Sequence, residues 1–435
     1  MTSRRALWIL IAAGTVARLV AFLLRPSLHP DEIFQYLEPA WQRLHGYGWP
    51  AWEWAVGLRS WVLPGYHGAW MAILEGLGVS DPAKLHAFLQ LHWAAVTLLT
   101  IPVAFRAGGF FAALLCALWP ELLYFAPHTL TEVPSAVFAC WGIGAWMAAR
   151  TGDDPRPMLK AGGLLSLAVC IRLPNAPIAV VPFVDLLVRR RWSSLGALAS
   201  AALVPLSIFG LIDQLVWGRP FHSLLAFLDY NFVQGRAAEH GTSPANEYLS
   251  ILAWRTSFTI VILLAAALVA IRRSWPALAP ALLLVLALST QAHKEERFLL
   301  AAWPLLALAW GIAVEQRLVL GSVGSALLLA GTAWGVERMP ILDYTGRAGL
   351  YDAQTWVGKQ PDSTGLLVEG RFHLSGGFFR LGKNVPLETF HPALLANPIF
   401  SHAAVRDGSA EEQWCKRAGL ERVWGERGFS VYKKR

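Results

Sequence analysis

Residues 6–24, ALWILIAAGTVARLVAFLL, form an apolar run, and residues 29–38, HPDEIFQYLE, follow it after a short link. A run of this kind is typical of a membrane-spanning helix, which needs roughly 20 mainly apolar residues. Arg4 and Arg5 precede the run, as in a signal peptide, but the nearby sequence has no small-residue cleavage site and further apolar runs follow. We therefore expect residues 6–24 to remain as the first of several spans, with the polar segment at its outer end.

The composition supports a membrane protein. Of the 435 residues, 55% are hydrophobic and only 15% are charged, whereas an ordinary soluble domain has about 25% charged residues. The 21 tryptophans agree, because Trp concentrates where hydrocarbon meets water. Arginine-rich cytoplasmic loops or anionic lipid explain the net charge of +8 better than nucleic-acid binding, for which no motif is present.

Eleven apolar runs are candidate membrane spans, and they predict an all-α polytopic membrane protein. The runs are Ala6–Leu24, Leu85–Phe105, Phe110–Phe125, Val133–Ala149, Leu159–Arg172, Pro174–Val188, Leu195–Leu215, Tyr248–Ile271, Pro276–Gln291, Phe298–Val314 and Leu318–Val336.

The short connections set the expected orientation. Basic residues gather in every second one, at Arg106, at 150–160, at 189–191, at 272–273 and at Arg317. The positive-inside rule then places the N-terminus in the cytoplasm, and an odd number of spans places residues 337–435 outside. This tail is less hydrophobic, and its patterns predict strands at 364–369 and 429–433 and a helix at 410–418. We expect a small extracytoplasmic α/β domain.

The polar residues of the first external loop suggest chemistry. Asp31 and Glu32 are adjacent carboxylates beside His29 at a membrane surface, where desolvation is costly. A carboxylate in a site that excludes water can act as general base toward an alcohol, and a second carboxylate can tune or orient the first. The alternative is helix capping, since Pro30 is suited to the first position of a helix.

Aromatic residues continue this loop. Trp52, Glu53 and Trp54, with Arg59 and the earlier Gln35, suit a sugar, because aromatic rings stack on its C–H faces while polar groups bond its hydroxyls. An aromatic belt at the membrane interface is the alternative for any single Trp. Arg18, inside the first span, is either a functional residue or one that extends to the headgroups.

A second constellation lies between the ninth and tenth expected spans. His293, Lys294 and Arg297 fall within five residues and form a positive site suited to a phosphate or diphosphate. As a bare charge run this segment would be a solvated turn. His128, Glu132 and Arg172 are weaker candidates expected on the same external face.

These segments resemble glycosyltransferase family 22, the multispanning mannosyltransferases that use a lipid-phosphate sugar donor. Within this family they most resemble the branch that adds the third mannose of glycosylphosphatidylinositol anchors, together with the bacterial relatives of that branch. The resemblance extends over residues 29–298. The matching stretches are His29–Gln35 with Glu38, Gly46–Gly48 with Trp52–Trp54 and Arg59–Ser60, Thr129–Glu132, Asp213 with Trp217, Asn231 with Gly241–Pro244 and Tyr248, and His293–Phe298. His128 departs from the pattern, since relatives carry arginine there.

The resemblance implies a C-type glycosyltransferase fold whose first extracytoplasmic loop, residues 25–84, is catalytic. It implies inversion at the anomeric carbon and a polyprenyl-phosphate mannose donor. Asp31 or Glu32 would deprotonate the acceptor hydroxyl. Cations such as Lys294 and Arg297, with His293 and Arg59 as further candidates, would hold the phosphate, so that neither a metal nor another cofactor is expected. His29, Gln35, Trp52, Glu53, His128, Glu132 and Arg172 are the expected substrate-binding residues.

We therefore expect a transmembrane glycosyltransferase domain at 1–336 and a soluble tail at 337–435, in a bacterial cytoplasmic membrane. The expected partners are the lipid bilayer, a polyprenyl-phosphate-linked sugar and a glycan or glycolipid acceptor. Another donor sugar, such as arabinose or glucose, is an alternative. A lipid-linked glycan flippase is a weaker one, because its charges would follow a path across the bilayer.

Overall fold

The computed structural model describes residues 3–24, 28–152, 154–336 and 347–434. The expected domain boundary after residue 336 borders residues 337–346, which lie outside this described part. The chain divides into two units. The first contains Met1–Leu24, Gly57–Val62 and Leu91–Met339, and the second contains Arg25–Val56, Leu63–Gln90 and Pro340–Arg435. The first loop and the C-terminal tail therefore belong to one unit, although most of the membrane domain separates them in sequence.

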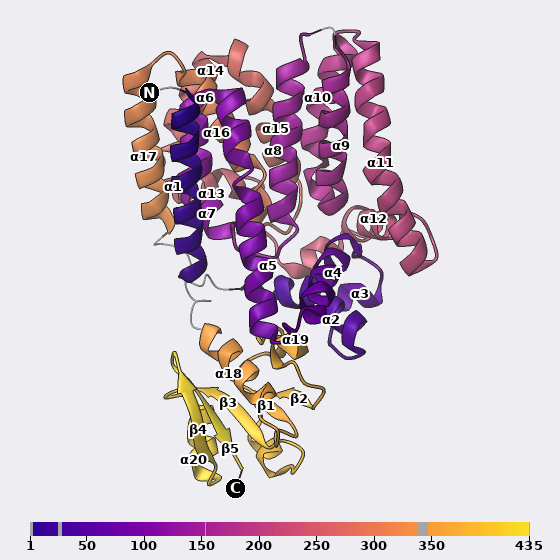
Figure 1. Ribbon diagram of the computed structural model, residues 1–435, viewed down its shortest axis with the longest axis vertical. Helices are drawn as coiled ribbons and strands as arrows, with labels where there is room; N and C mark the ends of the chain where they lie inside the picture. Colours follow the sequence, from indigo (N-terminus) through magenta and orange to yellow (C-terminus); the bar gives the residue numbers. More distant parts are fainter. Residues whose placement is uncertain (1–2, 25–27, 153, 337–346, 435) are drawn as a thin grey trace. The chain divides into compact units, whose positions relative to one another are not determined.

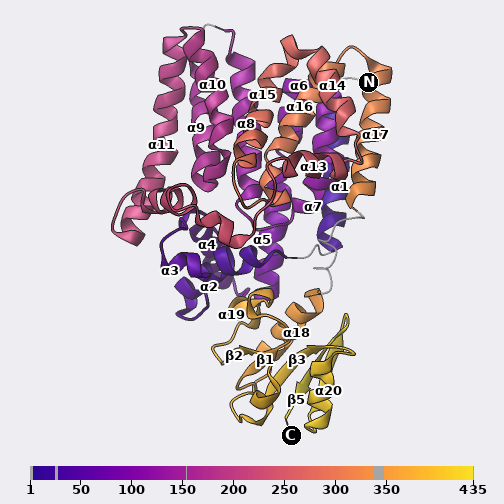
Figure 2. The same cartoon turned by 180° about the vertical axis from the view of Figure 1, so that it is seen from behind.

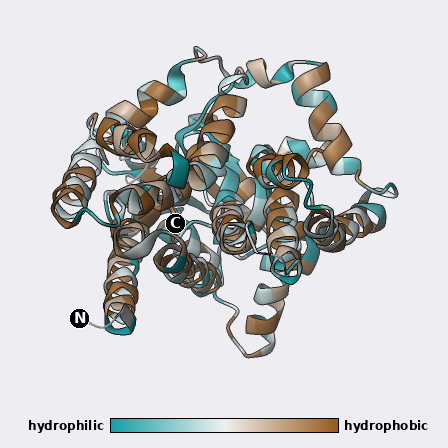
Figure 3. Ribbon diagram, turned by 90° about the horizontal axis from the view of Figure 1, so that it is seen from above, coloured by the Kyte–Doolittle hydropathy of each residue, from teal (hydrophilic) through white to brown (hydrophobic). Residues whose placement is uncertain are grey.

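The first unit is helical, and many of its helices run side by side (Figure 1). Apolar residues, brown in Figure 3, predominate along them. Its helices are α1 (Ser3–Leu23), α6 (Thr100–Leu118), α7 (Pro120–Phe125), α8 (Glu132–Ala149), α9 (Arg156–Ile171), α10 (Ala176–Val188), α11 (Trp192–Trp217), α12 (His222–Leu228), α13 (Glu247–Arg255), α14 (Ile260–Val269), α15 (Ile271–Ser289), α16 (Ala302–Val314) and α17 (Leu318–Val336). Shorter helical turns are η2 (Leu173–Asn175), η3 (Asp229–Val233), η4 (Arg236–His240) and η5 (Glu296–Leu299).

These helices account for the predicted membrane domain. Among the described residues, five helices are long and apolar enough to cross a membrane, and a sixth candidate is the pair α13 and α14, which is bent by 106°. The chain is thus a multi-pass membrane protein, while the count of eleven spans stays a prediction. Gly109, with a φ of 75°, interrupts α6 between the second and third expected spans.

Arg18, for which the sequence left a functional role and an extension to the headgroups open, is buried between helices. Its guanidinium is buried and donates to Thr97 Oγ1 at 2.7 Å and to the carbonyls of Gly14, Ala117 and Cys116 at 3.2, 3.0 and 3.0 Å. Because these groups come from α1, α6 and the end of α5 (Pro82–Thr97), Arg18 ties three helices together. All three of its nitrogens are hydrogen-bonded, which lowers the cost of burying the charge.

The second unit joins the first loop to the tail. From the loop it takes the π-helical segment η1 (Glu32–Leu37), α2 (Glu38–His45), α3 (Trp52–Ala55), most of α4 (Val62–Gly76) and the beginning of α5. From the tail it takes α18 (Ala348–Gly358), α19 (Gly377–Leu381), α20 (Ala410–Arg417), η7 (Phe372–Leu374) and η8 (Pro392–Ala396). Its strands are β1 (Leu366–Val368), β2 (Leu387–Thr389), β3 (His402–Arg406), β4 (Glu421–Glu426) and β5 (Phe429–Lys433).

The tail forms a mixed sheet in the order β2-β1-β3-β5-β4 (Figure 2). β1 is parallel to β2 and β3, and β5 is antiparallel to β3 and β4. Alternate residues face opposite sides. Leu366 and Val368 pack with α18, whereas Leu367 shares a second cluster with Cys415 of α20. The two predicted strands and the predicted helix are confirmed as β1, β5 and α20, with small differences at their ends.

Small residues let α6 and α16 approach closely. A Cβ atom at Gly311 would lie 2.1 Å from the carbonyl oxygen of Gly108, so the contact has no room for a methyl group. We expect Gly311→Ala to lower the midpoint of thermal unfolding in detergent, because backbone atoms of two helices would have to move apart. Gly196 of α11 is a matched control, since a Cβ atom there would have no neighbour within 4 Å. Gly196→Ala should leave the midpoint unchanged or raise it. Equal midpoints for the two variants would contradict this account of the packing.

Candidate active site

The two adjacent carboxylates of the first loop have different surroundings. Glu32 is completely buried, and its Oε1 accepts the backbone N–H of His29 at 2.9 Å, while its own N–H donates to the His29 carbonyl. This exchange is one half of a capping box, so the capping that the sequence suggested falls to Glu32. The Asp31 side chain makes no capping hydrogen bond and is 22% exposed. Of the two, Asp31 is the carboxylate with a partly solvent-exposed side chain.

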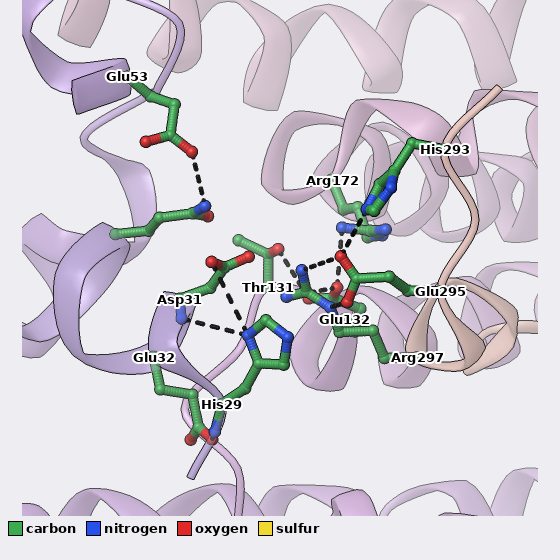
Figure 4. A network of polar contacts seen from close by, with 11 residues as sticks. His29, Asp31, Glu32, Glu53, Thr131, Glu132, Arg172, His293, Glu295 and Arg297 are labelled. Atoms are coloured by element: carbon green, nitrogen blue, oxygen red, sulfur yellow. Dashed lines mark hydrogen bonds and ion pairs between the residues drawn. The ribbon is translucent and has the colours of Figure 1, made fainter. Parts of the chain in front are cut away.

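His29 is oriented toward Asp31 (Figure 4). Its Nδ1 accepts the backbone N–H of Asp31 at 3.2 Å and lies 3.8 Å from Asp31 Oδ1. Since Nδ1 acts as an acceptor, the neutral ring carries its proton on Nε2.

The aromatic segment folds back on η1. Gln35 Nε2 donates to Glu53 Oε1 at 2.8 Å, and the Trp54 indole N–H donates to the Gln35 carbonyl at 3.1 Å. Gln35 and Glu53 are buried, whereas the side chain of Trp52 is exposed. Gln35 and Glu53 thus hold the loop together, and Trp52 is the member of this predicted set with an accessible ring.

A network of ion pairs lies in the first unit and contains several predicted residues (Figure 4). Glu132 Oε1 is 3.1 Å from Arg172 Nη1 and 3.4 Å from Arg297 Nη1. Arg297 also donates from Nε and Nη2 to the two carboxylate oxygens of Glu295 at 2.7 and 3.0 Å. His293 Nε2 lies 2.9 Å from Glu295 Oε1. Glu132, Arg172 and Arg297 are buried, and two arginines face two carboxylates.

Both arginines also lie over the ring of Phe298. The guanidinium carbons of Arg172 and Arg297 are 4.6 and 5.2 Å from the ring centre. Such cation–π contacts orient the planar guanidinium groups. The predicted basic segment is therefore an ordered network rather than the solvated turn of the alternative interpretation.

Lys294 has a different environment from Arg297. Its ammonium donates to the carbonyls of Ser243 and Gln291 and so joins the loop before α13 to the loop after α15. The Ser243 N–H donates to the Ala292 carbonyl at 2.9 Å and strengthens the same junction. Because an ammonium has three N–H groups, these two bonds leave Lys294 one donor for an anion.

Arg59 and His128 are the remaining predicted residues. Arg59 is half-buried on the short segment Gly57–Val62. His128 is buried, with its ring 5.0 Å from Tyr124 and 5.5 Å from Phe125. Among the described residues, no group of three or more His, Cys, Asp or Glu side chains is arranged to hold a metal ion.

Sequence reasoning missed a second buried ion-pair cluster. Arg255 Nε is 3.9 Å from Glu121 Oε1, and its Nη2 is paired with Glu296. Glu296 thus anchors the basic segment to α7 and α13, while the next residue, Arg297, faces Glu132. Glu121 lies inside an apolar run, and a carboxylate there was a signal that could have identified the cluster.

The sequence is similar to known mannosyltransferases. The chain is 29% identical over 327 residues to GPI mannosyltransferase 3 of Yarrowia lipolytica, covering 71% of this chain and 62% of that relative. It is 28% identical over 326 residues to Mannosyltransferase APTG1 of Arabidopsis thaliana, covering 70% and 58%. The chain therefore spans about three fifths of the length of these curated relatives.

The fold is similar to crystal structures of ArnT from Cupriavidus metallidurans. The apo structure matches with a TM-score of 0.65 at 14% identity, covering 99% of this chain and 98% of that one. The structure bound to undecaprenyl phosphate matches with a TM-score of 0.60 at 14% identity, covering 98% and 97%. A sequence model of Alg9-like mannosyltransferases matches residues 8–339, more than half of the chain. The chain therefore belongs to the Alg9-like mannosyltransferase family.

Proposed function

We propose that the protein is an inverting mannosyltransferase that transfers mannose from a polyprenyl phosphate to a hydroxyl of a lipid-linked or cell-surface glycan. Family membership supports the sugar and the lipid-phosphate donor. The observation that carries the mechanism is the accessible carboxylate of Asp31 at the start of a buried helical segment, next to a Glu32 that is occupied in capping.

Asp31 acts as the general base in this mechanism. Its carboxylate takes the proton of the acceptor hydroxyl as the oxygen forms a bond to the anomeric carbon of mannose. The bond between that carbon and the phosphate oxygen breaks, and the polyprenyl phosphate leaves with the electron pair. Because attack and departure occur on opposite faces, the anomeric configuration is inverted. Glu32 keeps the backbone in place through its bond to His29.

Lys294 and Arg297 bind the phosphate of the donor. Lys294 retains one ammonium N–H, and a phosphate that replaces Glu295 on Arg297 would receive two parallel hydrogen bonds from the guanidinium. Glu132 holds Arg172 and Arg297 through the exchange, since both arginines share its Oε1. His293, Arg59, His128 and the exposed ring of Trp52 complete the proposed donor and acceptor contacts, and Gln35 and Glu53 support them by holding the loop together.

We further propose that the domain at 1–336 crosses a bacterial cytoplasmic membrane about eleven times. The N-terminus then lies in the cytoplasm, and loop 25–84 and the tail at 337–435 lie outside. The fold likeness to ArnT and the arginines of the short connections support this arrangement.

Asp31→Asn tests the assignment of the base. We expect kcat for mannose transfer from labelled polyprenyl-phosphate mannose to fall by about 10²- to 10⁴-fold, with the donor KM unchanged, because an amide cannot take the proton. Transfer that persists at the wild-type rate in Asp31→Asn would rule the assignment out. If the protein flips a lipid-linked glycan in vesicles and transfers no sugar, it is a transporter rather than an enzyme. If it uses polyprenyl-phosphate arabinose or glucose as well as the mannose donor, the assignment of mannose as the donor sugar is wrong.

Lys294→Ala combined with Arg297→Ala tests the phosphate site. Loss of charged hydrogen bonds worth about 1.5–3 kcal/mol each should raise the donor KM by tenfold or more. Arg189 is a matched control, since it is half-exposed, pairs with Asp185 and lies in an expected cytoplasmic connection. Arg189→Ala should leave the donor KM unchanged. Wild-type donor kinetics in the double variant would remove these residues from the proposed site.

A further inference from the structure

The carboxylate of Glu38 connects the first loop to the C-terminal sheet domain. Its Oε2 accepts the backbone N–H of Trp49 at 2.6 Å, and its Oε1 accepts the backbone N–H of Phe379 at 2.6 Å. Trp49 belongs to the same loop, whereas Phe379 lies on α19 near the other end of the chain. Glu38 is completely buried, so both bonds are shielded from water.

On the tail side of this contact, Gly377 allows the backbone to approach the Glu38 carboxylate closely. Gly377 has a φ of 61°, which L-residues rarely adopt, and a Cβ atom there would lie 2.2 Å from Glu38 Oε1. Glycine is therefore required both for the conformation and for the close approach. Burial raises the pKa of Glu38 to about 7, although the backbone N–H groups of Phe379, Trp49 and Phe378 lower it. A buried carboxylate that meets only backbone N–H groups contributes directional specificity more than stability.

Aromatic rings enclose this polar contact. Rings of the loop and of the tail approach one another in four pairs, with centroid separations of 5.6 to 6.1 Å: Phe34 with Phe372, Trp49 with Phe372, Trp41 with Phe379, and Tyr47 with Phe378. One buried cluster includes Ile33 and Leu37 of the loop together with Tyr351 and Phe379 of the tail. The loop and the tail thus share a hydrophobic core, with Glu38 as its directional element.

Glu38 is also linked rigidly to Asp31. Asp31 precedes η1, and Glu38 follows it, with the Glu38 N–H bonded to the Ile33 carbonyl. Every residue of η1 is buried. A shift of Glu38 would therefore move η1 and change the position of the Asp31 carboxylate.

We propose that Glu38 is a positioning residue through which the C-terminal domain fixes η1 and the Asp31 carboxylate in the geometry needed for transfer. The catalytic part of this proposal rests on the proposed function of Asp31, whereas the contact between loop and tail does not. The C-terminal domain is then required for full transferase activity.

The test uses the full chain in lipid nanodiscs, with Glu38→Gln and Gly377→Ala as variants on the two sides of the contact. Gln at 38 places an N–H group against a backbone N–H, and Ala at 377 displaces the carboxylate while Glu38 remains. Both variants should lower kcat by tenfold or more with the donor KM within twofold of wild type. Both should also speed hydrogen exchange in residues 29–38 and 377–381, while exchange in α6 and α16 stays at the wild-type rate.

Lys359→Ala is the matched control. Lys359 of the tail pairs with Asp81 of the first loop at 2.6 Å, so it also connects these two segments. Its side chain is 55% exposed, and a solvated ion pair contributes little to stability. Its kcat and exchange should equal those of wild type. Wild-type kcat in both Glu38→Gln and Gly377→Ala would overturn the proposal, as would a fall in kcat with faster exchange throughout α6 and α16. If the wild-type protein transfers no mannose, the proposed function fails, and unchanged exchange at 29–38 in Gly377→Ala would separately refute the positioning contact.

Discussion

The shared carboxylate of Glu132 is the interaction on which the membrane domain's polar centre depends. Burying an isolated charge among apolar helices costs far more than a folded protein has in reserve, so each buried arginine must meet a carboxylate or several carbonyls. Glu132 meets this condition for Arg172 and Arg297 together, because one of its oxygens lies near both guanidinium groups. The loop 293–298 can therefore hold Arg297 inside the fold, where an anion would interact with its guanidinium more strongly than at a solvated surface.

The same rule assigns different tasks to the acids of the first loop. Glu32 and Glu38 are completely buried; Glu32 accepts the backbone N–H of His29, and Glu38 accepts those of Trp49 and Phe379, so each has a structural task. Within the segment 29–38, Asp31 is the carboxylate that keeps solvent exposure. A general base must exchange its proton with its surroundings in each cycle, and this difference in burial separates the proposed base from the acids that support it.

Much of the architecture could be predicted from the sequence because it depends on local patterns. Apolar runs of sufficient length coincide with helices, and alternating residues at 429–433 coincide with a strand. The segments 29–38 and 293–298 stood out because charges beside apolar helices are rare. The sequence could not show that Glu32 caps the helical segment while Asp31 stays accessible, because this depends on the backbone conformation of a single turn. The hydrogen bonds of Arg18 and the ion pair between Arg255 and Glu121 depend on which helices pack together. The spacing of residues in the sequence does not show this.

The contacts between the tail and the first loop could not be predicted, because they join residues that are far apart in the sequence. Glu38 and Phe379 are 341 residues apart, and no periodicity within either segment indicates the other. The family match reaches residue 339 and so includes Glu38 but not α19. A carboxylate inside the matched region thus accepts hydrogen bonds both from within it and from outside it. The boundary of the family match is consequently not the boundary of the unit that holds the proposed base, and the unit that contains Asp31 is built from both ends of the chain.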